Sequence, residues 1–132
     1  MIIRRLEDIE GTARAVTGDG WHSYRLLVKA DGLGFSLHDT FVHAGTTLQL
    51  WYKHHLEACY CLEGEGSVEK LADGEIYELR PGTLYALDQN DQHIVRAKTA
   101  LRLICVFNPP LSGHERHDAD GSYELSPTDS AD

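Results

Sequence analysis

The sequence lacks long apolar runs, helical patterning and an excess of positive charge. No run approaches the roughly 20 apolar residues that a membrane-spanning helix needs, so we expect no membrane segment. Lysine and arginine number 12 against 21 aspartate and glutamate residues, which gives a formal net charge of −9. This acidic balance argues against nucleic acid or an anionic membrane as a partner. Apolar residues nowhere follow the helical period for three turns, so a helical bundle is not expected either.

Cysteine is scarce and occurs an odd number of times. Cys59, Cys61 and Cys105 each lie in a strand-like apolar run, where a thiol behaves as a small hydrophobic side chain. A Cys-x-Cys metal site at Cys59 and Cys61 is not favoured, because the chain has no second cysteine pair. Residues 1–11 carry two arginines but lack the apolar core and the small-residue cleavage site of a signal peptide. We therefore expect a cytoplasmic protein.

Short strand-like segments separated by turn signals make up most of the chain. Strands are expected at residues 1–4, 21–29, 35–43, 46–52, 58–62, 67–71, 75–79, 84–87, 94–97 and 101–107, with one helical turn at 5–10. Asp73 and Gly74 form the clearest hairpin signal. In residues 35–43 polar side chains recur at every second position on one face of the strand, as regularly as apolar side chains do on the other. Many short strands without crossover helices are typical of an antiparallel sandwich or barrel.

The chain is expected to form one domain followed by a distinct tail. A length of 132 residues suits a single hydrophobic core, which we assign to a barrel at residues 1–108. The strand pattern stops there, and residues 109–132 are polar and contain glycine. From Asn108 onward six acidic residues stand against one arginine, so −5 of the net charge of −9 lies in this part. Residues 109–132 are predicted to be a mobile lid or a disordered tail.

Two stretches have the spacing of the cupin motifs. Gly45, Glu57 and Gly64 match the glycines and the glutamate of the first motif, G-x5-H-x-H-x3-E-x6-G. Gly74 and Gly82 match the glycines of the second motif, G-x5-P-x-G-x2-H-x3-N. This layout resembles the cupin superfamily, which implies an all-β, jelly-roll-like antiparallel barrel.

The chain departs from the cupin pattern at the metal ligands. Trp51 and Lys53 occupy the H-x-H positions, and Tyr85 replaces the histidine of the second motif. A carboxylate from Glu57, a phenolate from Tyr85 and an imidazole from His93 could still hold a metal, because two hard oxygens and one nitrogen suit iron, with manganese or zinc as lesser candidates. The alternative from spacing alone is that Glu57 is a surface charge, Tyr85 a core aromatic and His93 a loop residue.

Longer strings resemble the ectoine synthase family over roughly residues 1–125. They lie at residues 21–27, 34–40, 51–66, 80–93 and 107–125. The resemblance implies a hydro-lyase that cyclises N-γ-acetyl-L-2,4-diaminobutyrate to the compatible solute ectoine with loss of water, as part of an osmotic-stress response. It also implies iron held by Glu57, Tyr85 and His93, and a homodimer.

Further side chains are expected to complete such a site. The guanidinium fork of Arg25 fits a substrate carboxylate, with a surface ion pair as the alternative. Tyr52 is the candidate for handling a proton on the reacting atoms, and His55 is expected to support Glu57, two residues away on the same strand face. The other candidates for substrate contact are Trp21, Thr40, Phe107, Glu115 and His117, for each of which core packing or solvent exposure is the ordinary alternative.

Two other functions remain open from the residues. Loss of the H-x-H pair would also suit a non-catalytic cupin that binds a small amphoteric ligand. A metal-dependent dioxygenase is less favoured, because the chain lacks the usual facial triad of two histidines and one carboxylate.

Overall fold

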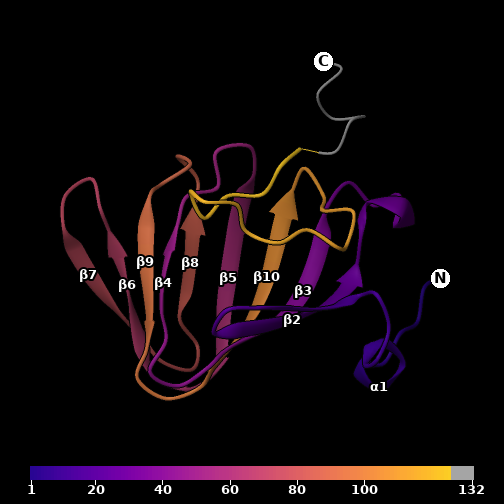
Figure 1. Cartoon of the computed structure of the whole chain (residues 1–132), viewed down its shortest axis with the longest axis horizontal. Coiled ribbons are helices and arrows are strands. Elements are labelled where there is room, and N and C mark those ends of the chain that lie inside the picture. Colours follow the sequence, from indigo (N-terminus) through magenta and orange to yellow (C-terminus); the bar gives the residue numbers. More distant parts are fainter. Residues whose placement is uncertain (126–132) are drawn as a thin grey trace.

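The computed structural model describes residues 1–125 as two antiparallel sheets that face each other (Figure 1). The strands are β1 (Ala15–Gly18), β2 (Trp21–Leu27), β3 (Ser36–Val42), β4 (Thr47–Leu50), β5 (Leu56–Glu63), β6 (Gly66–Lys70), β7 (Glu75–Leu79), β8 (Leu84–Leu87), β9 (His93–Ala97) and β10 (Leu101–Asn108). Six form one sheet in the order β1-β2-β3-β10-β5-β8, and four form the other in the order β4-β9-β6-β7. The all-β cupin-type architecture is confirmed, although the two sheets do not join into a closed barrel within residues 1–125.

Helices are minor elements. Helix α1 (Leu6–Ile9) has four residues, as the expected turn at 5–10 indicated, and η1 (Lys29–Asp31) is a single 3-10 turn between β2 and β3. In residues 1–125 no helix is long and apolar enough to cross a membrane.

The expected strand at residues 1–4 is wrong, and β1 was not predicted. Residues 1–4 have no regular secondary structure, and Arg4 instead makes two hydrogen bonds of 2.8 Å to the carboxylate of Asp31. Strand β1 has only four residues and pairs with β2 through the turn at residues 18–21. A strand this short carries too little alternation to be recognised from its own sequence.

Every second side chain of the central strands points into the space between the two sheets and fills it. In β10 every second residue is buried, and β2 buries Trp21, Ser23 and Arg25 on its inner side. Ser36 and His38 of β3 are also almost fully buried. The interior therefore combines an apolar core with a group of polar side chains, and that group marks the functional site.

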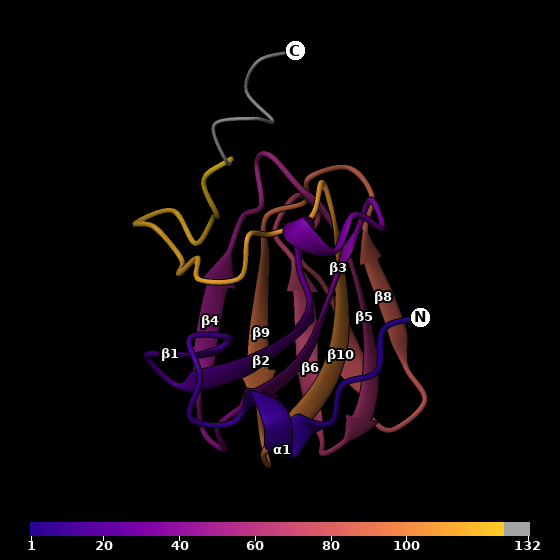
Figure 2. The ribbon, with the colours of Figure 1, turned by 90° about the vertical axis from the view of Figure 1, so that its right-hand side faces the viewer.

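Residues 109–125 (yellow in Figures 1 and 2) form no regular element but cross the upper ends of the strands. The amide of Trp51 donates to the carbonyl of Gly121 at 3.0 Å, and the amide of Lys29 donates to that of Leu111 at 2.8 Å. Leu111 is fully buried and Tyr123 is 4% exposed. This part of the expected lid is therefore packed on the two sheets, and its remainder, residues 126–132, lies outside the described residues.

The ion pair of Arg4 with Asp31 gives a prediction for stability. Hydrogen bonds from Arg4 and from the Val28 amide lower the pKa of Asp31 to about 2. A depressed carboxyl pKa stabilises the fold above the unfolded value of about 4, and this contribution is lost as the pH falls toward 2. Asp31→Asn should therefore reduce the free energy of unfolding by about 1 kcal/mol at pH 7 and by much less at pH 2, where half of the folded carboxyl groups are protonated.

Urea denaturation at both pH values measures this difference, with Asp19→Asn in the exposed turn before β2 as the control. An equal loss in the Asp31 variant at pH 7 and pH 2 would show that its carboxylate charge does not anchor the N-terminal segment.

Candidate active site

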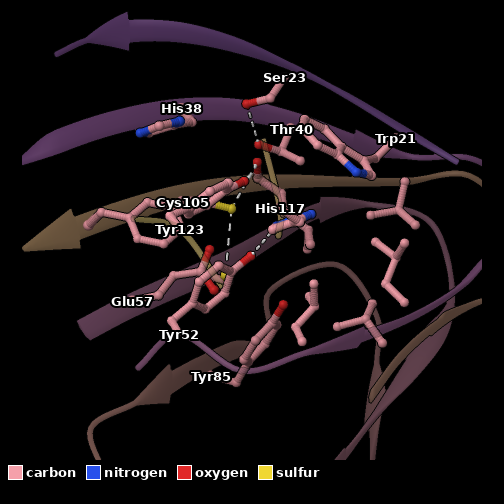
Figure 3. Close-up of a pocket in the computed structure, with 17 residues that line it drawn as sticks. Trp21, Ser23, His38, Thr40, Tyr52, Glu57, Tyr85, Cys105, His117 and Tyr123 are labelled. Carbon is pink, nitrogen blue, oxygen red and sulfur yellow. Dashed lines mark hydrogen bonds between the residues drawn. The ribbon is translucent and has the colours of Figure 1, made fainter. Parts of the chain in front are cut away.

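A cavity lies between the two sheets and beneath residues 109–125 (Figure 3). Its polar and aromatic lining consists of Trp21, Ser23, His38, Thr40, Tyr52, Glu57, Cys59, Tyr85, Cys105, Phe107, His117 and Tyr123. The space open to the centres of water molecules is about 40 Å³, which is room for about three waters. An organic substrate needs more space, so its entry requires movement of some part of the lining.

Glu57 is the only acidic residue of the described residues that line this cavity. It lies on β5 opposite Phe107 of β10 and Leu87 of β8, and its side chain is only 7% exposed. Burial raises the pKa of Glu57 to about 8, although hydrogen bonds from the thiols of Cys59 and Cys105 oppose this rise. A carboxylate in such surroundings is costly unless a cation neutralises it.

His93 presents a buried nitrogen without a partner. Its Nδ1 donates a hydrogen bond of 2.9 Å to the carbonyl of Asp91, which can only accept. Burial lowers the pKa of His93, so the ring is neutral and Nε2 carries a lone pair. Within residues 1–125 this buried Nε2 has no hydrogen-bond partner. A neutral imidazole whose other nitrogen is held by a carbonyl is the usual arrangement of a metal ligand.

Tyr85 completes the set of expected metal ligands. It lies on β8 directly opposite Cys59, and its ring centroid is 6.4 Å from that of His93. Burial raises the pKa of Tyr85 well above its usual value, so the phenol ionises at neutral pH only beside a cation. Figure 3 shows that Tyr52, Glu57 and Tyr85 lie together on one side of the cavity. The unpartnered nitrogen of His93 and the oxygens of Glu57 and Tyr85 are donors of the kinds that bind a metal ion.

Tyr52 is linked to the tail. Its hydroxyl shares a hydrogen bond of 2.8 Å with Nε2 of His117, whose ring is stacked on Tyr123 at a centroid distance of 4.5 Å. Burial lowers the pKa of His117 to about 4 and raises that of Tyr52 well above its usual value. Both groups are therefore neutral near pH 7, and the hydroxyl and the ring nitrogen are joined by a hydrogen bond between uncharged partners.

Arg25 is fully buried without a carboxylate partner among the described residues. Its Nε donates to Ser23 Oγ at 3.3 Å and its Nη2 to the carbonyl of Glu115 at 3.0 Å, whereas no group in residues 1–125 accepts from the buried Nη1. The guanidinium lies 5.9 Å from the ring centroid of Tyr123 and next to Ser23, two residues that line the cavity. A buried cation of this kind is costly unless it receives an anionic group.

Most of the remaining predicted residues lie in the wall of the cavity. Trp21 packs edge-on against His117 at 5.0 Å, and Phe107 packs edge-on against Tyr52 at 5.1 Å. Thr40 shares a hydrogen bond of 2.9 Å with Ser23. The structure thus brings residues from β2, β3, β10 and the tail around one space.

Glu115 and His55 take other positions. The carboxylate of Glu115 accepts hydrogen bonds from the amides of residues 112–114, so it closes a turn of the tail, and its main-chain carbonyl meets Arg25. His55 is 2% exposed and its ring lies edge-on to Phe107 and Tyr123 at 6.0 and 6.4 Å. His55 is therefore buried next to the site rather than solvated in a loop.

Sequence reasoning gave no functional role to five polar or aromatic residues of the cavity wall, namely Ser23, His38, Cys59, Cys105 and Tyr123. Cys105 lies opposite Cys59, and Tyr123 is buried in a tail that reads as polar. His38 is 1% exposed, shares a hydrogen bond of 2.9 Å with Ser36, and has its pKa lowered well below the usual value by burial and by Arg25. The regular polar side of residues 35–43 was a usable signal for His38, whereas the positions of Cys105 and Tyr123 depend on distant partners.

Comparisons with known proteins agree on one family. A family model described as ectoine synthase matches residues 1–127. The L-ectoine synthase of Desulfatibacillum aliphaticivorans is 56% identical over 127 residues, which are 95% of this chain and 98% of that protein. A crystal structure of ectoine synthase from P. lautus is 48% identical, covers 96% of this chain and 92% of that one, and superposes with a TM-score of 0.86. An RmlC-like cupin from Shewanella frigidimarina, 21% identical over 72% of this chain and 82% of that one, has a TM-score of 0.59 and shares the fold.

Proposed function

The chain belongs to the ectoine synthase family, and we propose that its substrate is N-γ-acetyl-L-2,4-diaminobutyrate, which it cyclises to ectoine with loss of water. In this reaction the α-amine attacks the acetamide carbonyl of the same molecule, so the enzyme acts as a hydro-lyase. One observation carries the proposal: two buried nitrogens without partners neighbour residues that line the cavity. Arg25 Nη1 belongs to a guanidinium next to Ser23 and Tyr123, and His93 Nε2 belongs to a ring next to Tyr52 and Tyr85. The first suits a carboxylate and the second suits a metal.

Glu57, Tyr85 and His93 are the residues that would hold iron, with zinc or manganese as lesser candidates. A bound iron ion would act as a Lewis acid toward the amide carbonyl and toward the departing oxygen, both of which are otherwise unreactive. Glu57 contributes a buried negative charge, and His93 contributes a lone pair whose direction is fixed by the Asp91 carbonyl.

The other residues of the cavity would fold and position the substrate. Arg25 holds the carboxylate, while Trp21 and Phe107 press on the carbon chain so that the amine and the acetamide of one molecule meet. Thr40 is placed to hydrogen-bond a polar group of the substrate. The amine must be neutral to attack, and the Tyr52 hydroxyl, held by His117, would handle a proton on the reacting nitrogen or oxygen.

Residues 109–125 would exclude bulk water while the ring closes. The reaction releases water, so a closed cavity favours the product. The main-chain carbonyl of Glu115 and the side chain of His117 attach this segment to Arg25 and Tyr52. The substrate opens these contacts on entry and restores them once bound.

We also propose a homodimer in the cytoplasm. Strand β8 forms an edge of the six-stranded sheet, and Leu84 on it is 63% exposed. An exposed apolar edge strand is a physical route to association with a second copy. Three free cysteines fit a reducing compartment.

The central experiment combines purified protein, ferrous iron and N-γ-acetyl-L-2,4-diaminobutyrate, and follows ectoine by chromatography. We expect ectoine from the iron-loaded protein and very little after chelation. No ectoine, together with full ligand affinity in Glu57→Ala, would favour a non-catalytic binding protein instead. Oxygen uptake during turnover would favour a dioxygenase.

Tyr85→Phe tests the metal assignment separately. Loss of the phenol oxygen should reduce both the iron content and the rate, measured by elemental analysis and by the same assay. Tyr60→Phe, on the exposed side of β5, is the matched control and should retain both. A Tyr85 variant that keeps its iron would show that another residue is the ligand.

A further inference from the structure

We propose that Cys59, Cys105 and Glu57 form a second cation site in the cavity, one that takes a thiophilic divalent ion such as cadmium or zinc. The inference does not depend on the reaction assigned above, because it concerns a group of donor atoms that exists whatever the enzyme does. The expected iron set leaves both thiols unused. It is the strand pairing that brings them together.

The geometry of the three donors suits such an ion. Cys59 and Cys105 are directly opposed on β5 and β10, with their sulfurs 3.5 Å apart. The two sulfurs and a carboxylate oxygen of Glu57 all lie within 4.8 Å of one another. Zinc–sulfur bonds of about 2.3 Å in a tetrahedron place two sulfurs about 3.8 Å apart. The thiols would therefore need to move by only a few tenths of an ångström.

The surroundings select the kind of ion. The donors are 1%, 4% and 7% exposed, so an ion there loses its water and keeps only strong ligands. Two sulfurs and one carboxylate favour a soft or borderline ion over magnesium or calcium, which require mainly oxygen ligands. On binding, each thiol releases its proton to solvent, and so does Glu57 where it is protonated. Two thiolates and one carboxylate around a divalent ion then carry a net charge of −1.

The third cysteine is not part of this cluster. Cys61 follows on the same face of β5, but its sulfur lies 3.4 Å from the carbonyl of Glu63. It is fully buried and so provides a matched control. The proposed site and the expected iron set have only Glu57 in common. An ion on the thiols would occupy that carboxylate, so it should compete with iron rather than assist it.

Cadmium is the probe, because its bonds to thiolate absorb in the ultraviolet. Metal-free protein is titrated with cadmium under reducing conditions, and bound metal is counted after gel filtration. We expect one ion per chain with a thiolate absorption band in wild type and in Cys61→Ser. Cys105→Ser and Cys59→Ser should each bind at least tenfold more weakly and lose most of the band. Circular dichroism and a second variant, Cys105→Ala, show whether each protein is folded.

Tyr85→Phe separates this site from the proposed iron site. That variant should keep the cadmium band even though its iron content falls. If Cys105→Ser and Cys105→Ala are folded and bind cadmium as wild type does, the proposal is wrong. It is equally wrong if Tyr85→Phe loses cadmium and Cys105→Ser does not, since the ion would then occupy the iron ligands.

Discussion

Glu57→Gln should lose most of its ring-closing activity and yet stabilise the metal-free protein at alkaline pH. The pKa of Glu57 is about 8 in the folded chain, against 4.5 for an ordinary glutamate. A raised carboxyl pKa contributes stability fully below pH 4.5, and this contribution is lost as the pH rises through 8. Glutamine stays neutral throughout, so the free energy of unfolding of the variant rises relative to that of wild type between pH 4.5 and 9. Each pKa unit is worth about 1.4 kcal/mol, which makes the gain on the order of a few kcal/mol.

Denaturation of both proteins in the presence of a chelator at pH 4.5 and pH 9 measures the gain. Ionisable groups away from Glu57 titrate alike in the two proteins, so the difference reports Glu57 and its direct neighbours. Glu63→Gln, on the exposed end of the same strand, should show no such pH-dependent gain. If the free energies of unfolding of wild type and Glu57→Gln depend on pH in the same way, burial does not raise the pKa of Glu57.

The same variant should lose on the order of a thousandfold in kcat/KM. An amide oxygen is a weaker metal ligand than a carboxylate, and activation of a carbonyl by a metal ion is worth several kcal/mol. A variant that is more stable but less active would show that the buried carboxylate of Glu57 serves the reaction at the expense of stability. A variant that folds, gains stability and remains active would place the chemistry elsewhere in the cavity.

The sequence predicted what depends on local pattern. Alternation and turn residues located most strands, and the cupin spacing selected Glu57 and Tyr85 from many acids and aromatics. Contacts between distant segments could not be predicted this way. The pairing of Cys59 with Cys105 depends on the register of β5 against β10, and no local signal reports that register. Tyr123 follows polar residues and is buried only because it stacks on Tyr52 and His117.

Gly121→Ala should detach the tail and reduce kcat/KM by about a hundredfold, the cost of misplacing catalytic groups by about an ångström. Gly121 has a φ of +72°, and an added Cβ would lie 2.4 Å from the Gln49 carbonyl oxygen and 2.8 Å from the Leu50 Cα. Both contacts are with main chain, so the tail must move away from β4. His117 and Tyr123, on either side of Gly121, would then leave the cavity, whereas the proposed iron ligands on β5, β8 and β9 would stay.

The control for backbone strain is Gly74→Ala. Gly74 has a φ of +73°, but no atom lies within 4 Å of its added Cβ, so this variant carries the conformational cost of about 1 kcal/mol without the clash. Gly121→Ala should keep its iron, lose activity and be cut faster by trypsin at Arg116 in the tail. Gly74→Ala should match wild type in all three measurements. Equal activity and equal cleavage in the two variants would show that docking of residues 109–125 is not needed, and that the barrel alone encloses the reaction.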